Sequence, residues 1–201
     1  YLLQEKLKSH KVGRDKLFSI LRANNLLIKP RKQYRKTTDS KHWLKKHKNL
    51  AEGIELTKPE QLWVADITYI PTRQGHSYLS LVTDAYSKQI MGYHLSEDLG
   101  AEGCLKALVM AIKARKYDHD LIHHSDRGLQ YCSESYQQIL RAAAIKPSMT
   151  EKYDPYQNAV AERVNGILKQ EFICGIQITD IKLMEKLIAQ SISIYNQERP
   201  H

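Results

Sequence analysis

Cysteine is scarce in this sequence, with only Cys104, Cys132 and Cys174 among 201 residues and no Cys-x-x-Cys pair. This scarcity argues against a disulfide framework and a thiolate zinc site, and it favours a reducing, cytoplasmic setting. No apolar run approaches the roughly 18–20 residues that a membrane-spanning helix needs, and the chain does not open on an apolar signal segment. The sequence therefore predicts a soluble intracellular protein without structural zinc.

Positive charge is concentrated in the first third of the chain. Residues 1–60 contain 16 Lys and Arg against 6 Asp and Glu, whereas residues 61–201 contain 15 basic and 16 acidic residues. Neutralising phosphates releases condensed counterions, so a segment as basic as 28–48 favours nucleic acid as its partner. A solvated linker whose charge only aids solubility is the alternative, and the charge run alone does not decide between them.

The chain divides into a helical leader, a basic linker and a core. Residues 1–28 show apolar positions at helical spacing in two short stretches separated by a turn at Gly13, which predicts a helix-turn-helix-like segment. Simple packing of two helices is the alternative interpretation. Pro30 ends the helical pattern, and we predict a basic linker over 29–60 and a globular core over 61–201.

The core alternates between strand and helix patterns. Three β-rich runs with hairpin-length connections predict an antiparallel meander, and two further short strands are separated by helices. We therefore predict an α/β fold, a mixed five-stranded sheet flanked by helices. The expected strands are 62–70, 77–83, 89–95, 120–124 and 145–149, and the expected helices are 101–116, 133–143, 157–172 and 179–196.

Two aspartates occupy unusual places in this pattern. Asp66 shares the parity of Leu62, Val64 and Ile70, so it points the same way as apolar side chains. An unpaired carboxylate there would cost about several kcal/mol, so a salt bridge, hydrogen bonds or a ligand must compensate it. Asp126 follows a short apolar strand, at the sheet edge where open α/β sheets bind ligands, although a turn residue would look the same.

A third carboxylate, Glu162, lies on the predicted helix 157–172. Asn158, Asn165 and Lys169 stand four residues before it and three and seven residues after it, which places all four on one stripe. A solvated helix face is the simpler interpretation of this stripe. Asp84 is a rival to Asp126, but its position before a turn favours a structural role.

The three carboxylates can meet in space, because two strands and a late helix can converge at one sheet edge. Acidic groups that converge repel one another unless cations hold them. Hard oxygen ligands without thiolates suit Mg²⁺ or Mn²⁺ rather than zinc. Two such ions, roughly 3.5–4 Å apart, can activate an attacking oxygen and stabilise a leaving one in phosphodiester displacement.

Five motifs stand out along the chain: WVADITYI at 63–70, VTDAYSK at 82–88, HSDRGLQY at 124–131, NAVAE at 158–162 and YNQERPH at 195–201. They resemble those of bacterial insertion-sequence transposases whose catalytic domain is similar to retroviral integrase. Asp126 and Glu162 are separated by 35 residues, as this family's pattern requires. The resemblance covers residues 61–201 well and residues 1–60 more loosely.

The resemblance implies a ribonuclease-H-like fold with an Asp-Asp-Glu triad. Asp66, Asp126 and Glu162 would then be the catalytic residues and the ligands of two Mg²⁺ or Mn²⁺ ions. The implied chemistry is hydrolysis that exposes a 3′-hydroxyl, followed by attack of that hydroxyl on another phosphodiester. The implied partners are double-stranded DNA, as element ends and target, and further copies of the chain in a dimer or larger assembly.

Candidate DNA contacts come from three segments. The loop before the Glu162 helix borders the scissile phosphate in the integrase-like family, the helix itself offers two cations, and the linker offers four more. For the loop and helix residues an ordinary solvated surface is the competing interpretation. The candidates are Lys152, Tyr153, Tyr156, Gln157, Arg163, Lys169, Arg31, Lys32, Arg35 and Lys36.

Two other functions remain open on the sequence alone. One is a catalytically inactive DNA-binding repressor or targeting module, and the other is a different ribonuclease-H-like nuclease that acts on RNA in a hybrid. The chain opens at Tyr1 without Met, and relatives usually continue beyond a position such as His201. We therefore expect the chain to be an internal section of a longer product.

Overall fold

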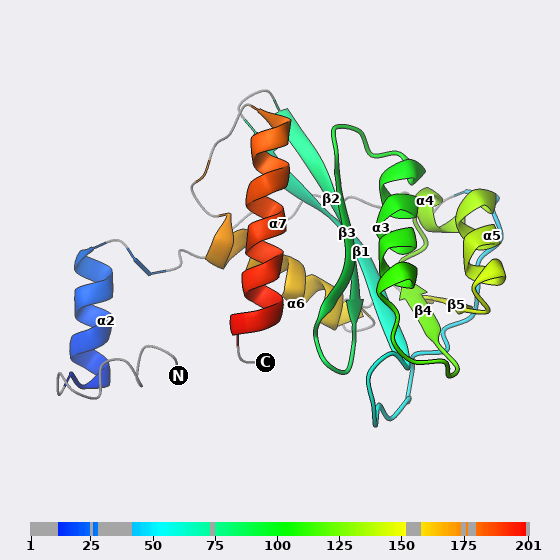
Figure 1. Cartoon of the computed structure of the whole chain (residues 1–201), viewed down its shortest axis with the longest axis horizontal. Coiled ribbons are helices and arrows are strands. Elements are labelled where there is room, and N and C mark those ends of the chain that lie inside the picture. Colours follow the sequence, from blue (N-terminus) through cyan, green and yellow to red (C-terminus); the bar gives the residue numbers. More distant parts are fainter. Residues whose placement is uncertain are drawn as a thin grey trace. The chain divides into compact units, whose positions relative to one another are not determined.

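A computed structural model describes residues 12–24, 26–27, 42–72, 75–151, 158–173, 176 and 180–199 (Figure 1). The chain forms two compact units, residues 1–34 and 35–201. In the first unit, helix α2 (Arg14–Ala23) has no buried residue, and Phe18 and Ile20 on it are exposed. The first helix predicted in the leader lies outside the described residues. No described helix combines the length and apolar character needed to cross a membrane.

The second unit is built on one mixed sheet. Strands β1 (Leu62–Thr72), β2 (Gly75–Asp84) and β3 (Ile90–Ser96) form an antiparallel meander. Strands β4 (Ile122–Ser125) and β5 (Lys146–Met149) continue the sheet in parallel to β1, which gives the order β3-β2-β1-β4-β5. The predicted mixed five-stranded sheet is confirmed.

Helices cover both faces of this sheet (Figure 1). The predicted helix 157–172 is divided, because its second half takes the wider π form. One face carries α3 (Ala101–Ala114), α4 (Leu129–Cys132) and α5 (Glu134–Ala142). The other face carries α6 (Ala159–Ile167), the π-helix η3 (Leu168–Phe172) and α7 (Ile181–Glu198).

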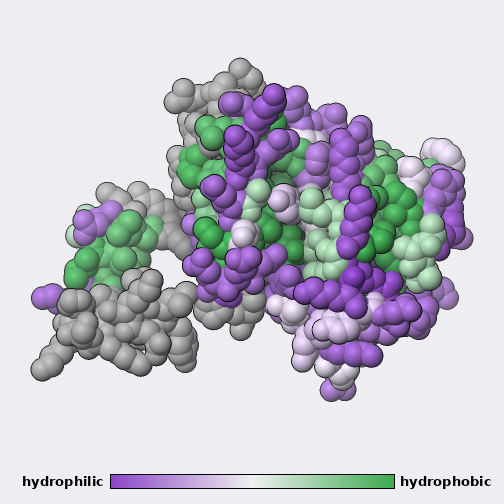
Figure 2. Space-filling view, viewed as in Figure 1, coloured by the Kyte–Doolittle hydropathy of each residue, from purple (hydrophilic) through white to green (hydrophobic). Residues whose placement is uncertain are grey.

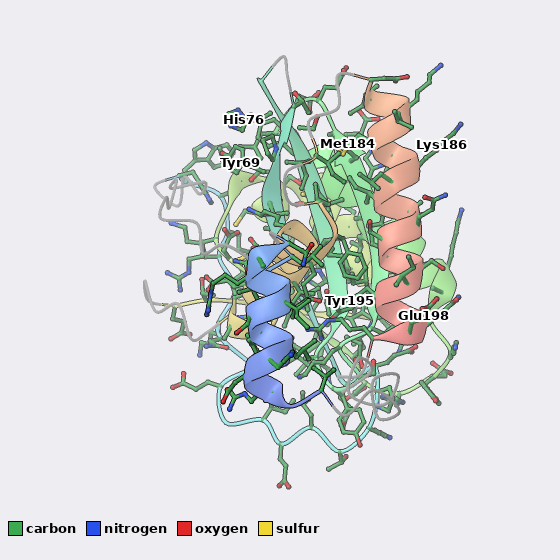
Figure 3. All side chains as sticks on the ribbon, turned by 90° about the vertical axis from the view of Figure 1, so that its left-hand side faces the viewer. Tyr69, His76, Met184, Lys186, Tyr195 and Glu198 are labelled. Atoms are coloured by element: carbon green, nitrogen blue, oxygen red, sulfur yellow. The ribbon has the colours of Figure 1, made fainter. Side chains whose placement is uncertain are left out.

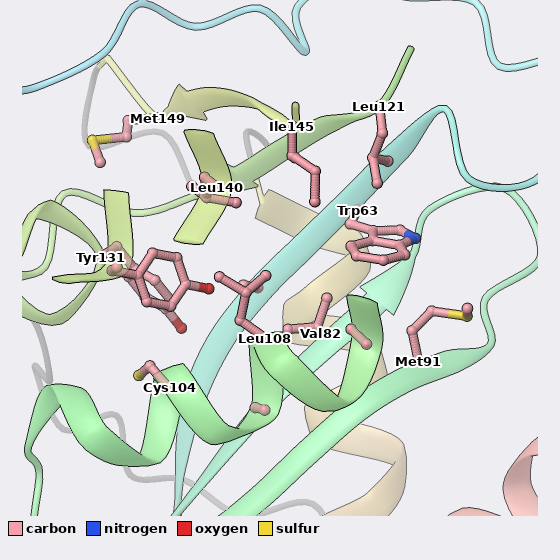
Figure 4. Packing of buried hydrophobic residues seen from close by; sticks show 14 of the residues in the cluster. Trp63, Val82, Met91, Cys104, Leu108, Leu121, Tyr131, Leu140, Ile145 and Met149 are labelled. Atoms are coloured by element: carbon pink, nitrogen blue, oxygen red, sulfur yellow. The ribbon is translucent and has the colours of Figure 1, made fainter. Parts of the chain in front are cut away.

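The two faces of β1 are both buried, and this explains its nearly continuous apolar run. Trp63 is fully buried with Leu108 and Tyr131 in the core cluster on the α3 side (Figure 4). Leu62 and Val64 pack with residues of α6 on the opposite side. Because side chains alternate along a strand, Asp66 belongs to the α6 side, as its parity predicts.

Helix α7 closes the α6 side with an amphipathic face. Met184 and Tyr195 are buried against the sheet, whereas Lys186 and Glu198 are exposed (Figure 3). Figure 2 shows hydrophilic side chains over the solvent face of this helix. Asn196 accepts a hydrogen bond from the Ile90 amide (2.9 Å) and donates one to the Ile90 carbonyl (3.0 Å). The YNQERPH motif therefore begins with residues that fasten α7 to β3.

Asp84 has the structural role that its position before a turn predicts. It is fully buried, and its Oδ2 accepts hydrogen bonds from the Ser87 amide (2.8 Å) and hydroxyl (2.6 Å). Its Oδ1 accepts a third from the Glu60 amide (2.8 Å). These bonds, two from the β2–β3 turn and one from the segment before β1, satisfy the carboxylate.

The later part of the predicted basic linker packs on the core. Leu44 contacts the cluster around Trp63, and Ile54 and Leu56 contact the cluster on the α6 side. The Glu60 carboxylate accepts hydrogen bonds from the backbone amides of residues 116 and 117. Residues 42–60 thus form part of the second unit.

Gly92 allows α3 to lie close to β3. A Cβ at this position would stand 2.1 Å from the Ala107 carbonyl oxygen and 2.7 Å from the Ala111 amide nitrogen, both of them backbone atoms. We expect Gly92→Ala to lower the free energy of unfolding by about 1–3 kcal/mol, because the helix must move away from the sheet. Urea unfolding measures this change.

Gly166→Ala on α6 is the matched control for Gly92→Ala. A Cβ there meets nothing within 4 Å, so we expect unchanged stability or a gain of up to about 1 kcal/mol. Equal urea midpoints for wild type and Gly92→Ala would contradict the proposed close approach.

Candidate active site

Asp66 and Asp126 lie side by side at the carboxyl end of β4. In the parallel pairing of β1 with β4, Val64 stands opposite His124. Asp66 comes two residues after Val64, and Asp126 comes two residues after His124. The same register, continued by two residues, therefore brings the two aspartates together. The pKa of Asp66 is raised to about 7, first by burial and second by the negative charge of Asp126. The two carboxylates are therefore close enough to repel each other.

The loop that carries Asp126 is held by its own hydrogen bonds. Asp126 Oδ1 accepts a bond from the Gly128 amide (2.9 Å), and the Ser125 hydroxyl donates to the Asp126 carbonyl (3.0 Å). The His42 ring donates from Nε2 to the Arg127 carbonyl at 2.7 Å. The Ser125 hydroxyl and the Arg127 carbonyl thus help to hold this loop in place.

Helix α6, which carries Glu162, is fastened to β1 by two asparagines. Asn158, which precedes the helix, donates from Nδ2 to the Ala65 carbonyl (3.1 Å), and Asn165 donates from Nδ2 to Asp66 Oδ2 (2.7 Å). These two bonds fasten the helix to β1 on either side of Glu162. Glu162 itself is an exposed residue. The protein still removes part of the water around its carboxylate, and this desolvation raises its pKa. The stripe predicted for these side chains does face the sheet at Asn158 and Asn165.

Electrostatics at Asp66 disfavour its ionised form. Burial, Asp126 and, more weakly, Glu162 raise its pKa, and only hydrogen bonds from the Ile67 amide and Asn165 lower it. Within the described residues, no lysine or arginine contributes to holding Asp66 ionised. A protein that needs this carboxylate ionised must supply positive charge from elsewhere.

The three carboxylates do not form one compact cluster. No three His, Cys, Asp or Glu side chains in the described ranges stand close enough together to hold a metal ion. The structure brings the two aspartates together, and Glu162 is a neighbour whose charge acts on Asp66 more weakly. The buried Oδ1 atoms of Asn158 and Asn165 lack hydrogen-bond partners in the same part of the chain.

The candidate DNA contacts are only partly described. Arg163 is exposed on α6, and its charge lowers the pKa of Tyr195, so it faces α7. Lys169 is half-buried in η3. The other candidates lie outside the described residues: Lys152, Tyr153, Tyr156, Gln157, Arg31, Lys32, Arg35 and Lys36.

The sequence does not predict a role at the site for two residues that contact it. Asn165 donates a hydrogen bond to Asp66, and the only sign of this in the sequence is its position three residues after Glu162, on the same stripe of the helix. His42 bonds to the Asp126 loop across 85 positions of sequence, and no local pattern indicates such a contact.

Comparison with known proteins assigns the core to a family. Models of the integrase core domain match residues 57–155 and residues 143–201. A 31 kDa protein of insertion element IS600 from Shigella sonnei is 37% identical over 94% of this chain and 71% of its own length. The IS3A transposase InsF of Escherichia coli K12 is 34% identical, over 90% of this chain and 64% of its own length.

Solved structures show the same fold at low sequence identity. The catalytic core domain of HTLV-2 integrase, solved in complex with magnesium, matches with a TM-score of 0.56 at 19% identity, over 70% of this chain and 89% of that one. A simian T-cell lymphotropic virus intasome chain matches with a TM-score of 0.60 at 19% identity, over 98% of this chain and 66% of that one. The chain has a ribonuclease-H-like integrase fold and belongs to the bacterial insertion-sequence transposases with an integrase core domain.

Proposed function

We propose that this chain carries out metal-dependent cleavage and strand transfer at the ends of a mobile insertion sequence. The observation that carries the proposal is the adjacent pair Asp66 and Asp126, with Glu162 on the helix fastened beside them. The chain spans between about half and 71% of the length of its curated relatives, so the reaction of the whole protein is part of this proposal.

The residues at the site fit a divalent cation. Two adjacent carboxylates, one of them with a pKa raised to about 7, gain from a positive charge that no described lysine or arginine provides at Asp66. Oxygen donors without thiolates suit Mg²⁺ or Mn²⁺. Asp66 and Asp126 would hold the cation, and Glu162, whose charge acts on Asp66, would be the third ligand.

A divalent cation held there supplies a Lewis acid for in-line phosphodiester displacement. The protein's own residues hold the two aspartate carboxylates in place. Asn165 donates to Asp66 and keeps one of its oxygens fixed, and Gly128 does the same for Asp126. No protein nucleophile is required, so the Ser125 hydroxyl, which bonds to the Asp126 carbonyl, has a structural role.

DNA is the proposed substrate, both as element ends and as target. The excess of positive charge in residues 1–60 supports this choice, because it would lie along phosphates. Strand transfer joins two ends to one target, so we propose that the chain acts as a dimer or a larger assembly on bacterial chromosomal DNA. The alternative of a catalytically inactive binding module leaves the costly acidic pair Asp66 and Asp126 without a purpose.

A nicking and joining assay tests the proposed function. The chain would be incubated with a labelled duplex that carries an element end, together with Mg²⁺, Mn²⁺ or EDTA. We expect a nick that leaves a 3′-hydroxyl, joining of that end to a second duplex, and no product in EDTA. Binding without any nicking in either metal would favour the inactive binding module.

A further inference from the structure

Trp43 is the most exposed large apolar side chain of the described core. Its relative exposure is 91%, whereas Trp63, the other tryptophan of the sequence, is fully buried. An exposed indole forgoes the stabilisation that burying its large surface would give. Such a ring is a typical platform for stacking against a ligand's flat face.

The backbone around Trp43 is held against the core, so this exposure has a fixed place. On one side, His42 donates to the Arg127 carbonyl at 2.7 Å. On the other side, Leu44 is partly buried against the cluster around Trp63. The indole therefore stands out between two anchors.

Residues 42–50, here called the strap, continue along the edge of the sheet. The Met149 amide donates to the Lys48 carbonyl (3.4 Å), and the Leu50 amide donates to the Ser148 hydroxyl (2.8 Å). His47 bonds to Gln137 of α5. The strap thus runs over β5 and α5.

The strap presents positive charge next to Trp43. Lys45, Lys46 and Lys48 are exposed, and the strap contains no Asp or Glu. Lys46, Arg127 and Asp126 all act electrostatically on Cys132, so Lys46 lies near the loop that carries Asp126. An aromatic ring among outward lysines matches a strand of bases and phosphates, because the ring stacks on bases while the cations neutralise the backbone.

We propose that the strap binds an unpaired stretch of DNA strand beside the active site, with Trp43 stacked on a base and Lys45, Lys46 and Lys48 along the phosphates. A base inside a duplex has its faces covered by its neighbours, so a stacking ring selects a frayed end or an overhang. The inference rests on the proposed function for its substrate class, DNA, and adds that part of that DNA is single-stranded.

Binding in EDTA, where no cleavage occurs, tests this inference. The full chain would be titrated with a blunt 20-base-pair duplex and with the same duplex carrying a six-thymine overhang, and both affinity and tryptophan emission would be followed. We expect the overhang to tighten binding and to quench the emission of Trp43. Trp43→Ala should lose about tenfold or more of the affinity that the overhang adds, and Trp43→Phe should keep part of it.

Tyr117→Ala is the matched control, because Tyr117 is also an exposed aromatic residue, at 48% relative exposure. Tyr117 precedes the start of β4, whereas the Asp126 loop follows the end of that strand. It should bind both duplexes like wild type. The inference is overturned if Trp43→Ala keeps the full preference for the overhang, or if it loses affinity for both duplexes equally. It is also overturned if Trp43 serves as a contact between copies of the chain. In that case sedimentation would show smaller assemblies for Trp43→Ala than for wild type, and the preference for the overhang would remain.

The two proposals can fail separately. A chain that shows Trp43-dependent overhang binding in EDTA but no nicking with Mg²⁺ or Mn²⁺ supports the strap and refutes the proposed function. A chain that nicks and joins DNA but shows no effect of Trp43→Ala on overhang binding does the reverse.

Discussion

Replacing Asp126 with Asn is expected to abolish metal-dependent DNA cleavage and joining. The amide has nearly the same shape but lacks the charge that attracts a divalent cation beside Asp66. We expect a loss of about a thousandfold or more, which corresponds to about 4 kcal/mol of lost transition-state stabilisation. Asp66→Asn and Glu162→Gln should behave alike. Initial rates of nicking on a labelled element-end duplex measure the loss.

Asp98→Asn is the matched control for these three variants, because Asp98 is an exposed carboxylate that caps the Gly100 amide in a loop. Its nicking rate should equal that of wild type. All variants should bind DNA in EDTA about as tightly as wild type, or slightly more tightly, since a negative charge has been removed near phosphates. Wild-type nicking by any one of the three neutralised variants would remove that residue from the proposed site.

The second large effect concerns stability. Asp66→Asn, which should abolish activity, should make the metal-free protein more stable. Burial and the charge of Asp126 raise the pKa of Asp66 to about 7, above its ordinary value of 3.8. Between these two values the folded chain binds more protons than the unfolded chain, so the free energy of unfolding falls as pH rises. The contribution of Asp66 is fully present below pH 3.8 and is lost as pH rises through about 7.

Asp66→Asn should therefore stabilise the metal-free protein at pH 8. The Asn side chain carries no charge to desolvate, so we expect a gain on the order of 1–4 kcal/mol. Thermal unfolding in EDTA at pH 5 and pH 8 measures this gain, which should be larger at pH 8. A variant less stable than wild type at pH 8 would show that the Asp66 carboxylate is already compensated within the protein.

Two further comparisons sharpen this test. Adding Mn²⁺ at pH 8 should raise the melting temperature of wild type but not that of Asp66→Asn, because a ligand that binds only the folded state stabilises it. Asn165→Ala removes a hydrogen bond that favours ionised Asp66, so it should raise the pKa of Asp66 further. The free energy of unfolding of this variant should therefore go on falling to a higher pH than that of wild type.

Much of the core could be predicted from the sequence because its signals are local. The apolar run of β1 and the helical spacing of α3 each occur within a short window, and they identified the elements and the mixed sheet. The parity of Asp66 correctly placed it on the same face of β1 as Leu62 and Val64, and the structure shows that α6 covers this face. The start of the π-helix η3 could not be predicted, because a single turn of i→i+5 bonds is too short to leave a repeated pattern in the sequence.

The contacts that complete the site depend on long-range packing. The hydrogen bond from His42 to the Arg127 carbonyl joins the predicted linker to the Asp126 loop. Neither segment has a sequence pattern that predicts contact with the other. Helical spacing placed Asn165 near Glu162, but only the approach of α6 to β1 shows that it reaches Asp66. The charge of the predicted linker left a nucleic-acid contact and a solvated linker open, and neither indicates that Ile54 and Leu56 within it pack against the core.

The most direct test of the central claim is the anomalous scattering of Mn²⁺ soaked into crystals of the chain at neutral pH. The account predicts a peak within roughly 2.0–2.3 Å of carboxylate oxygens from both Asp66 and Asp126, with Glu162 turned towards it or towards a second peak. Saturating Mn²⁺ that leaves no peak shared by the two aspartates would contradict the account.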